Sequence, residues 1–189
     1  MTYVALLRGI NVGGNSMIRM SELKECLENA GFADVRTYIQ SGNVIFATPK
    51  TATARLAQKM EAAIEKKFAI NVGVAVFSAQ EWQEIVRRAP NWWGKKTGWK
   101  HNLLALLPGT KPSDVIAAMG ALKPEIEQVT AGPGVVYQSL SMELFGKTTS
   151  SKLPSHPLYR RVTVRNYNTT VKLAALLTST GNCAAGSTP

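Results

Sequence analysis

Residues 35–47 read VRTYIQSGNVIFA, and this stretch decides the fold. β-Branched or apolar residues alternate with larger polar ones over Val35–Gln40, which predicts a strand with two different faces. Ser41-Gly42 predicts a tight turn, and Asn43–Ala47 returns as the second strand of a hairpin.

The segments on either side of this hairpin complete a known supersecondary unit. A strand is expected at Tyr3–Ile10 and a helix at Ser21–Ala30 before it, then a helix near Thr51–Phe68 and a strand at Gly73–Phe77 after it. The order βαββαβ is typical of a ferredoxin-like half, an antiparallel sheet with two helices on one face.

The pattern then restarts, because ALLRG at residues 5–9 returns as ALLPG at residues 105–109. The expected second copy has a helix at Ser113–Leu122 and a hairpin of Ile126–Thr130 with Val135–Leu140. A helix at Ser151–Tyr159 and a strand at Arg161–Arg165 are expected to follow. Asn168 is expected to cap a last helix, which runs through Leu177 and is ended by Gly181. The predicted fold class is therefore α+β, a tandem duplication of ferredoxin-like (βαββαβ) halves with antiparallel sheets, the second half shortened and extended by a C-terminal helix. The expected boundaries are residues 1–79 for the first half, 80–100 for a linking helix (Gln80–Ala89) and a Trp- and Lys-rich connection (Pro90–Lys100), 101–180 for the second half and 181–189 for a flexible tail.

Charge is the unusual feature of the composition. The 189 residues hold 22 Lys and Arg against 12 Asp and Glu, a net +10. Residues 85–113 and 144–189 contain no acidic residue, so the excess lies in two windows. Clustered cations favour an anionic partner such as nucleic acid or a phosphorylated small molecule, although a solvated basic loop that keeps the protein soluble gives the same pattern.

The first window also holds tryptophans, whose rings stack on unpaired bases or anchor a loop on the core. The candidate nucleic-acid-binding residues are Arg87, Arg88, Trp92, Trp93, Lys95, Lys96, Trp99, Lys100, Arg160 and Arg161.

A second candidate site is a ligand site at strand ends. The loop Gly9–Ser16 nearly matches a phosphate-binding loop, but Asn15 replaces the lysine that such loops need, and glycines there also serve turns with positive φ. Polar residues gather at nearby strand ends, where they either bind a ligand or form an internal polar interface. The candidate ligand-binding residues are Arg8, Asn11, Gly13, Gly14, Asn15, Arg36, Tyr38, Gln40, Asn43, Arg165 and Asn166.

Catalytic and metal-binding patterns are sparse. His101 and His156 have no cysteine or carboxylate at metal-ligand spacing, so we expect no metal and no cofactor, and both histidines are interpreted as incidental. Cys26 lies on the inward side of its predicted helix and is interpreted as a small apolar residue. The chain has no apolar run near 18 residues and no secretory signal pattern, which indicates a cytoplasmic protein without a membrane partner; its oligomeric state is open.

Three stretches carry a family resemblance: ALLRGINVGG (residues 5–14), TYIQSGNV (37–44) and TVRNYNT (163–169). They resemble the signatures of the bacterial domain-of-unknown-function family DUF1697, and the match extends from Met1 to about Thr178. The resemblance implies a stand-alone cytoplasmic protein of two α+β halves and implies no particular activity. The aromatic residue after Arg165-Asn166 is usually tryptophan in the family and is Tyr167 here.

The leading hypothesis is a non-catalytic binding protein for an anionic partner, nucleic acid or a phosphorylated metabolite. The alternative is a small enzyme acting on a phosphate-bearing substrate at the Gly9–Ser16 loop, with Arg8, Arg36 and Arg165 around it. In a third interpretation the polar strand-end residues serve only the structure.

Overall fold

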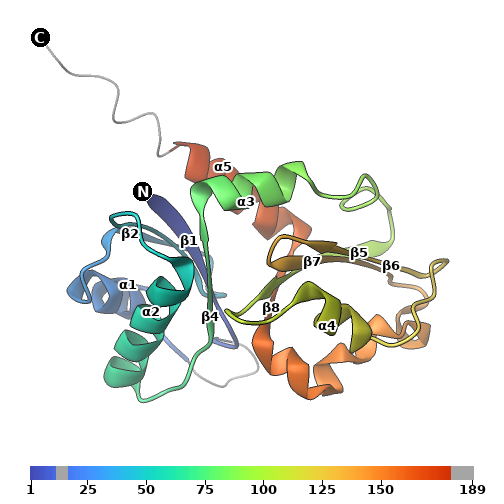
Figure 1. Cartoon of the computed structure of the whole chain (residues 1–189), viewed down its shortest axis with the longest axis horizontal. Coiled ribbons are helices and arrows are strands. Elements are labelled where there is room, and N and C mark those ends of the chain that lie inside the picture. The colour runs from blue at the N-terminus through green and yellow to red at the C-terminus, as the bar shows by residue number, and fades with distance from the viewer. Residues whose placement is uncertain (12–16, 180–189) are drawn as a thin grey trace, which may run out of the picture. The chain divides into compact units, whose positions relative to one another are not determined.

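The computed structural model describes residues 1–11 and 17–179 (Figure 1). Gly13, Gly14 and Asn15, the expected tail from residue 181 and the expected helix end at Gly181 lie outside these residues. The chain divides into two compact units. Unit 1 comprises Met1–Gln83 and the chain from Val171 onward, and unit 2 comprises Glu84–Thr170.

Unit 1 contains the predicted βαββαβ half. Its elements are β1 (Thr2–Leu7), α1 (Met20–Asn29), β2 (Ala33–Tyr38), β3 (Asn43–Ala47), α2 (Thr53–Phe68) and β4 (Val74–Ser78). The sheet order is β2-β3-β1-β4 with every pairing antiparallel, which is the ferredoxin-like order. The hairpin is confirmed, and its register places Arg36 opposite Ile45.

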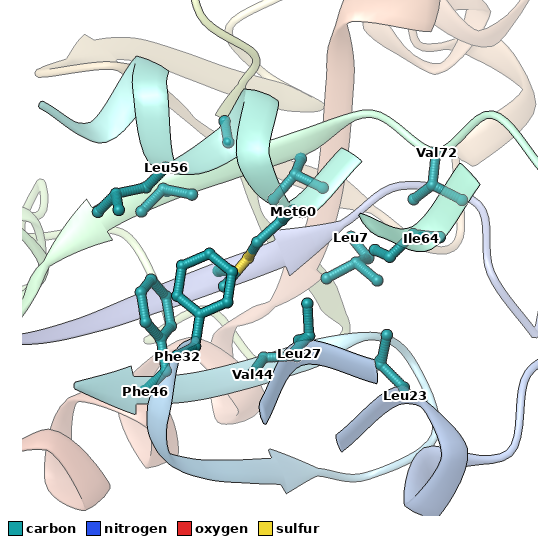
Figure 2. Packing of buried hydrophobic residues seen from close by; sticks show 14 of the residues in the cluster. Leu7, Leu23, Leu27, Phe32, Val44, Phe46, Leu56, Met60, Ile64 and Val72 are labelled. Carbon is teal, nitrogen blue, oxygen red and sulfur yellow. The ribbon is translucent and has the colours of Figure 1, made fainter. Parts of the chain in front are cut away.

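One face of this sheet and the two helices form the core of unit 1. Figure 2 shows Leu27, Phe32 and Met60 converging on Val44 and Phe46 of β3. The rings of Phe32 and Phe46 meet edge to face with centroids 5.0 Å apart, a favoured aromatic geometry. Apolar residues at helical spacing on α1 and α2 thus fix both helices on the same face of the sheet.

The other face of the sheet is not an open surface. Val4, Leu6 and Ile45 lie there, since they alternate with the core residues, and all three are buried. The ring of Phe77 lies 5.4 Å from that of Trp82, which is fully buried on α3 (Ala79–Arg87). An exposed base-stacking sheet, as in RNA-recognition domains, is therefore absent from the described part of unit 1.

Unit 2 repeats the same topology, which confirms the duplication. Its elements are β5 (Trp99–Leu106), α4 (Pro112–Ala117), β6 (Glu127–Gly132), β7 (Val135–Ser141), three short 3₁₀ segments, η1 (Phe145–Lys147), η2 (Ser150–Ser155) and η3 (Pro157–Arg161), and β8 (Val162–Asn166). The helix α5 (Tyr167–Ser179) begins in unit 2 and continues from Val171 in unit 1. The sheet order β6-β7-β5-β8 reproduces that of unit 1 strand for strand. Leu104, Leu106 and Val136 pack with Val115 of α4 on one face.

The second copy departs from the sequence expectation at its helices. The helix expected at Ser113–Leu122 ends at Ala117, and Gly120 takes a φ of +78° three residues later. The helix expected at Ser151–Tyr159 consists of the 3₁₀ segments η2 and η3, because Pro154 and Pro157 cannot donate the main-chain bonds of a continuous α-helix.

Helices α3 and α5 carry the chain across the division between the units. The side-chain Nε2 of Gln83 donates to the main-chain oxygen of Ala174 at 2.7 Å, which ties the two helices together within unit 1. Across residues 1–11 and 17–179, no helix is long and apolar enough to cross a bilayer. In those same residues, no cluster of three or more His, Cys, Asp or Glu side chains is arranged to hold a metal ion.

Candidate functional site

Asn11, at the start of the glycine-rich loop, has a structural function in the fold. Its side-chain Nδ2 donates to the main-chain oxygens of Ile18 at 2.9 Å and Gln40 at 3.0 Å, and its Oδ1 accepts from the Ile18 amide at 2.8 Å. The residue adopts the left-handed conformation, with φ +55°, which asparagine tolerates better than most residues. Asn11 therefore holds the main chain at Ile18 beside its own position and joins it to the hairpin turn.

The hairpin turn itself is held by Asn43, another residue of the predicted ligand set. Asn43 is fully buried, and its Nδ2 donates to the Tyr38 main-chain oxygen and the Ser41 hydroxyl, each at 3.0 Å. Gly42 has a φ of +72°, and a Cβ there would lie 2.8 Å from Leu7. The turn thus packs tightly against the end of β1, and only glycine fits that position.

The arginines of the predicted strand-end site are spread apart. Arg8 follows β1, whereas Arg36 lies on β2 level with Val4, two strands away. At ~3.3 Å per residue and ~4.8 Å between strands, their Cα atoms are roughly 16 Å apart. Arg36 and Gln40 are exposed and Tyr38 is partly buried. The two arginines are therefore not adjacent in the sheet.

Arg165 and Asn166 belong to β8 in unit 2. The Arg165 guanidinium is buried and donates to the Thr163 hydroxyl at 2.9 Å and the Val164 main-chain oxygen at 2.8 Å. Burial lowers the pKa of Arg165 to about 10. Asn166 caps α5, since its Oδ1 accepts from the Thr169 amide at 2.8 Å, so the cap expected at Asn168 lies two residues earlier.

The Trp- and Lys-rich connection is anchored on unit 2 by Trp93. This indole is 3% exposed, and its Nε1 donates to the Asn102 main-chain oxygen at 2.9 Å. Its ring meets those of Tyr137 and Tyr167 edge to face at 5.4 and 4.9 Å. Gly94 has a φ of +85°, and a Cβ there would lie 2.2 Å from the Tyr167 ring. Of the two functions that the sequence left open for tryptophan, Trp93 anchors the loop.

Lys96 and Trp99 form a different arrangement. The Lys96 ammonium lies 4.0 Å from the centroid of the Trp99 ring, a cation–π contact, and both side chains are partly exposed. Lys95 and Lys100 beside them are exposed, and Trp92 is partly exposed. Three lysines and a partly exposed tryptophan therefore lie within six residues of chain, with Lys96 at the ring and Lys100 on the opposite face of β5.

His101 holds this arrangement in place, although the sequence alone assigns it no role. Its Nε2 lies 3.1 Å from the Lys96 main-chain oxygen and its Nδ1 lies 2.6 Å from the Ser139 hydroxyl. A carbonyl oxygen can only accept, so Nε2 carries the proton and Nδ1 accepts from Ser139. Ser139 lies on β7 directly opposite His101, a pairing that a single sequence does not show.

The remaining basic candidates lie elsewhere in unit 2. Arg87 and Arg88 both pair with Glu84, and hydrogen bonds from Arg87 help to lower the pKa of Glu84 to about 2. The main-chain oxygen of Arg161 accepts from the amide of Leu107, just after the end of β5. Lys100 lies near the start of β5, seven residues and roughly 23 Å from Leu107. Arg160 and Arg161 therefore do not adjoin the Lys96–Trp99 pair.

Glu127 is a buried carboxylate that sequence reasoning missed. It is 1% exposed and accepts hydrogen bonds from the amides and hydroxyls of Thr149 and Ser150 and from the Lys123 amide. Burial acts to raise its pKa, but the bonds from Ser150 and Thr149 outweigh it and lower the pKa to about 2. Glu127 thus fastens the 3₁₀ region to β6 and is not an accessible acid or base.

Comparisons with known proteins show which structures and which family this chain resembles. One solved structure, described as that of a conserved bacterial protein from Streptococcus pneumoniae, is 30% identical with a TM-score of 0.82. The match covers 93% of this chain and 98% of that one. No curated protein matches the chain. A family model described as "Protein of unknown function (DUF1697)" matches residues 1–137, well over half of the chain, so the chain belongs to the family DUF1697.

Proposed function

We propose that the chain is a cytoplasmic, non-catalytic binding protein for an anionic partner, which it holds at the connection Pro90–Lys100. The observation that carries this proposal is the Lys96 ammonium 4.0 Å from the Trp99 ring, between the exposed Lys95 and Lys100. These lysines stand on a backbone that the buried Trp93 fixes, so little ordering is needed on binding.

The distribution of charge between the units supports the same location. Unit 2 holds twelve Lys and Arg against five Asp and Glu, a net +7, which leaves +3 for the rest of the chain. One of those five acids, Glu127, is buried and occupied by hydrogen bonds, so it contributes little to the surface. A local excess of this size attracts anions and speeds their association.

Nucleic acid and phosphorylated metabolites both carry the phosphate groups that such a site would engage. Each phosphate neutralised by a lysine releases counterions, and the affinity of a polyanion then falls as salt rises. The strand-end residues favour the same location indirectly. The side-chain amides of Asn11, Asn43 and Asn166 form hydrogen bonds with main-chain groups, so these residues stabilise the fold and the connection Pro90–Lys100 is the better candidate for ligand binding.

The test is a titration of fluorescently labelled long-chain inorganic polyphosphate and single-stranded RNA into the protein between about 50 and 200 mM salt. We expect log affinity to fall linearly with log salt, and Lys95→Gln/Lys100→Gln to make the slope for RNA shallower by about 1.4. The matched control is Lys111→Gln/Arg160→Gln, which removes the same charge from exposed positions at the other end of β5. Absence of binding at low salt, a flat slope, or an equal effect of the control would refute the proposal.

A further inference from the structure

We infer that the anionic partner is single-stranded nucleic acid, with one base stacked on Trp99. This inference rests on the proposed function and names the class of partner for the same site. Phosphate recognition alone explains the lysines, but it leaves an accessible indole ring without a use.

The tryptophans of the connection are not equivalent. Trp93 is buried and uses its indole N–H inside unit 2, as structural tryptophans do. Trp99 is partly exposed, and a lysine ammonium lies over its ring. An aromatic ring beside a cation is a combination with which proteins bind unpaired bases, the ring stacking on the base and the cation binding a phosphate.

The residue just before Trp99 borders open space. This residue, Gly98, has a φ of +75°, and no atom lies within 4 Å of the place where its Cβ would be. The Gly98 main-chain oxygen accepts from the Met142 amide at 3.0 Å, and the Met142 side chain is 53% exposed. Exposed apolar surface at Met142 therefore adjoins the strand that begins at Trp99, which suits the flat apolar face of a base.

The backbone that presents Lys96 is preorganised. His101 donates from Nε2 to the Lys96 main-chain oxygen, and Ser139 holds the other ring nitrogen of His101. The held backbone keeps Lys96 beside Trp99, so a phosphate can be bound next to a stacked base. Paired bases within a duplex are stacked on each other and cannot take this position, which favours single strands.

The experiment compares Trp99→Leu with Trp99→Phe, using a labelled oligouridylate, the same sequence as a duplex, and polyphosphate. Trp99→Leu should weaken oligouridylate binding about tenfold, the loss expected for one stacked base, whereas Trp99→Phe keeps a ring and should stay within about threefold of the wild type. Neither substitution should change polyphosphate binding by more than about twofold, because the lysines remain. Trp92→Leu is the matched control, a neighbouring and partly exposed tryptophan, and should leave oligouridylate binding unchanged.

A second readout reports on stacking itself. Oligouridylate should quench tryptophan fluorescence in the wild type, and Trp99→Phe should remove that quenching while it preserves the affinity. The inference is overturned if Trp99→Leu leaves oligouridylate binding intact, if Trp92→Leu weakens it as much, or if the duplex binds as tightly. In each of those cases the proposed function still holds if polyphosphate binds and its affinity falls as salt rises. If the wild type binds no polyanion at all, both the proposed function and this inference are refuted.

Discussion

Replacing Glu127 by glutamine should destabilise unit 2 strongly. The carboxylate is buried, and both oxygens accept from an amide and a hydroxyl, Thr149 on one side and Ser150 on the other. A glutamine has the same shape, but its NH₂ group would face two donors where an acceptor is needed. The substitution therefore loses two charge-assisted bonds and sets donors against each other.

The pKa gives the magnitude. The folded value of about 2, against an ordinary 4.5, corresponds to about 3 kcal/mol of stability at ~1.36 kcal/mol per pH unit. A lowered folded pKa stabilises the protein above 4.5, and this contribution is lost as the pH falls toward 2. Between pH 7 and pH 3 the wild type should lose about 2 kcal/mol through this group alone.

Urea unfolding at several pH values, followed by tryptophan fluorescence, measures both effects. At pH 7 Glu127→Gln should unfold with about 3 kcal/mol less free energy than the wild type, and the difference should narrow as the pH is lowered to 3. Glu125→Gln, an exposed neighbour, is the control and should change stability by less than about 0.5 kcal/mol. If the difference between the wild type and Glu127→Gln stays constant from pH 7 to pH 3, the carboxylate charge is not what holds the 3₁₀ region.

Three further substitutions, one of them with a matched glycine control, test the packing and capping of unit 2. Tyr137 is buried and its hydroxyl donates to a main-chain oxygen of α3 at 2.6 Å, so Tyr137→Phe should lower the free energy of unfolding in urea at pH 7 by about 1–3 kcal/mol. Burial raises the pKa of Tyr137 to about 12, so the difference between the wild type and Tyr137→Phe should shrink as the pH rises from 10 to 12. Gly94→Ala should lower the free energy of unfolding by about 2–5 kcal/mol, because a Cβ would clash with the Tyr167 ring. Gly98→Ala is the control, since Gly98 has a similar φ but open space around it, and it should cost about 1 kcal/mol. If both substitutions lower the melting temperature equally, the clash is not the cause. Asn166→Ala should remove the α5 cap at about 1 kcal/mol, and faster hydrogen exchange in the first turn of the helix would report it, whereas unchanged exchange would contradict the capping role.

The fold could be predicted from sequence because its signals are local. The alternation over Val35–Gln40, the Ser41-Gly42 turn and the ALL repeat each lie within a few residues, and periodicity over such a span reports the direction of side chains. The misplaced helices had equally local causes. Pro154 and Pro157 were visible in the sequence, and their effect on a continuous α-helix outweighs the apolar spacing around them.

The candidate site was harder to predict, since polarity does not reveal the partner of a side chain. Asn11 bonds to a residue 29 positions away in the hairpin turn, and Glu127 to residues 22 and 23 positions away. Such contacts are set by tertiary structure, so an asparagine that holds a turn and one that binds a ligand look alike in sequence. Trp93 and Trp99 differ in the same way, because burial alone separates the anchor from the accessible ring.

The interruption of unit 1 by unit 2 has a consequence for biosynthesis. Residues 1–83 leave the ribosome first, but the partner that Gln83 contacts, Ala174, is made only after the 87 residues of unit 2. At ~5–20 residues per second the delay is roughly 4–17 s. During that interval unit 2 can fold before α3 meets α5, so unit 1 is completed by a helix synthesised after unit 2.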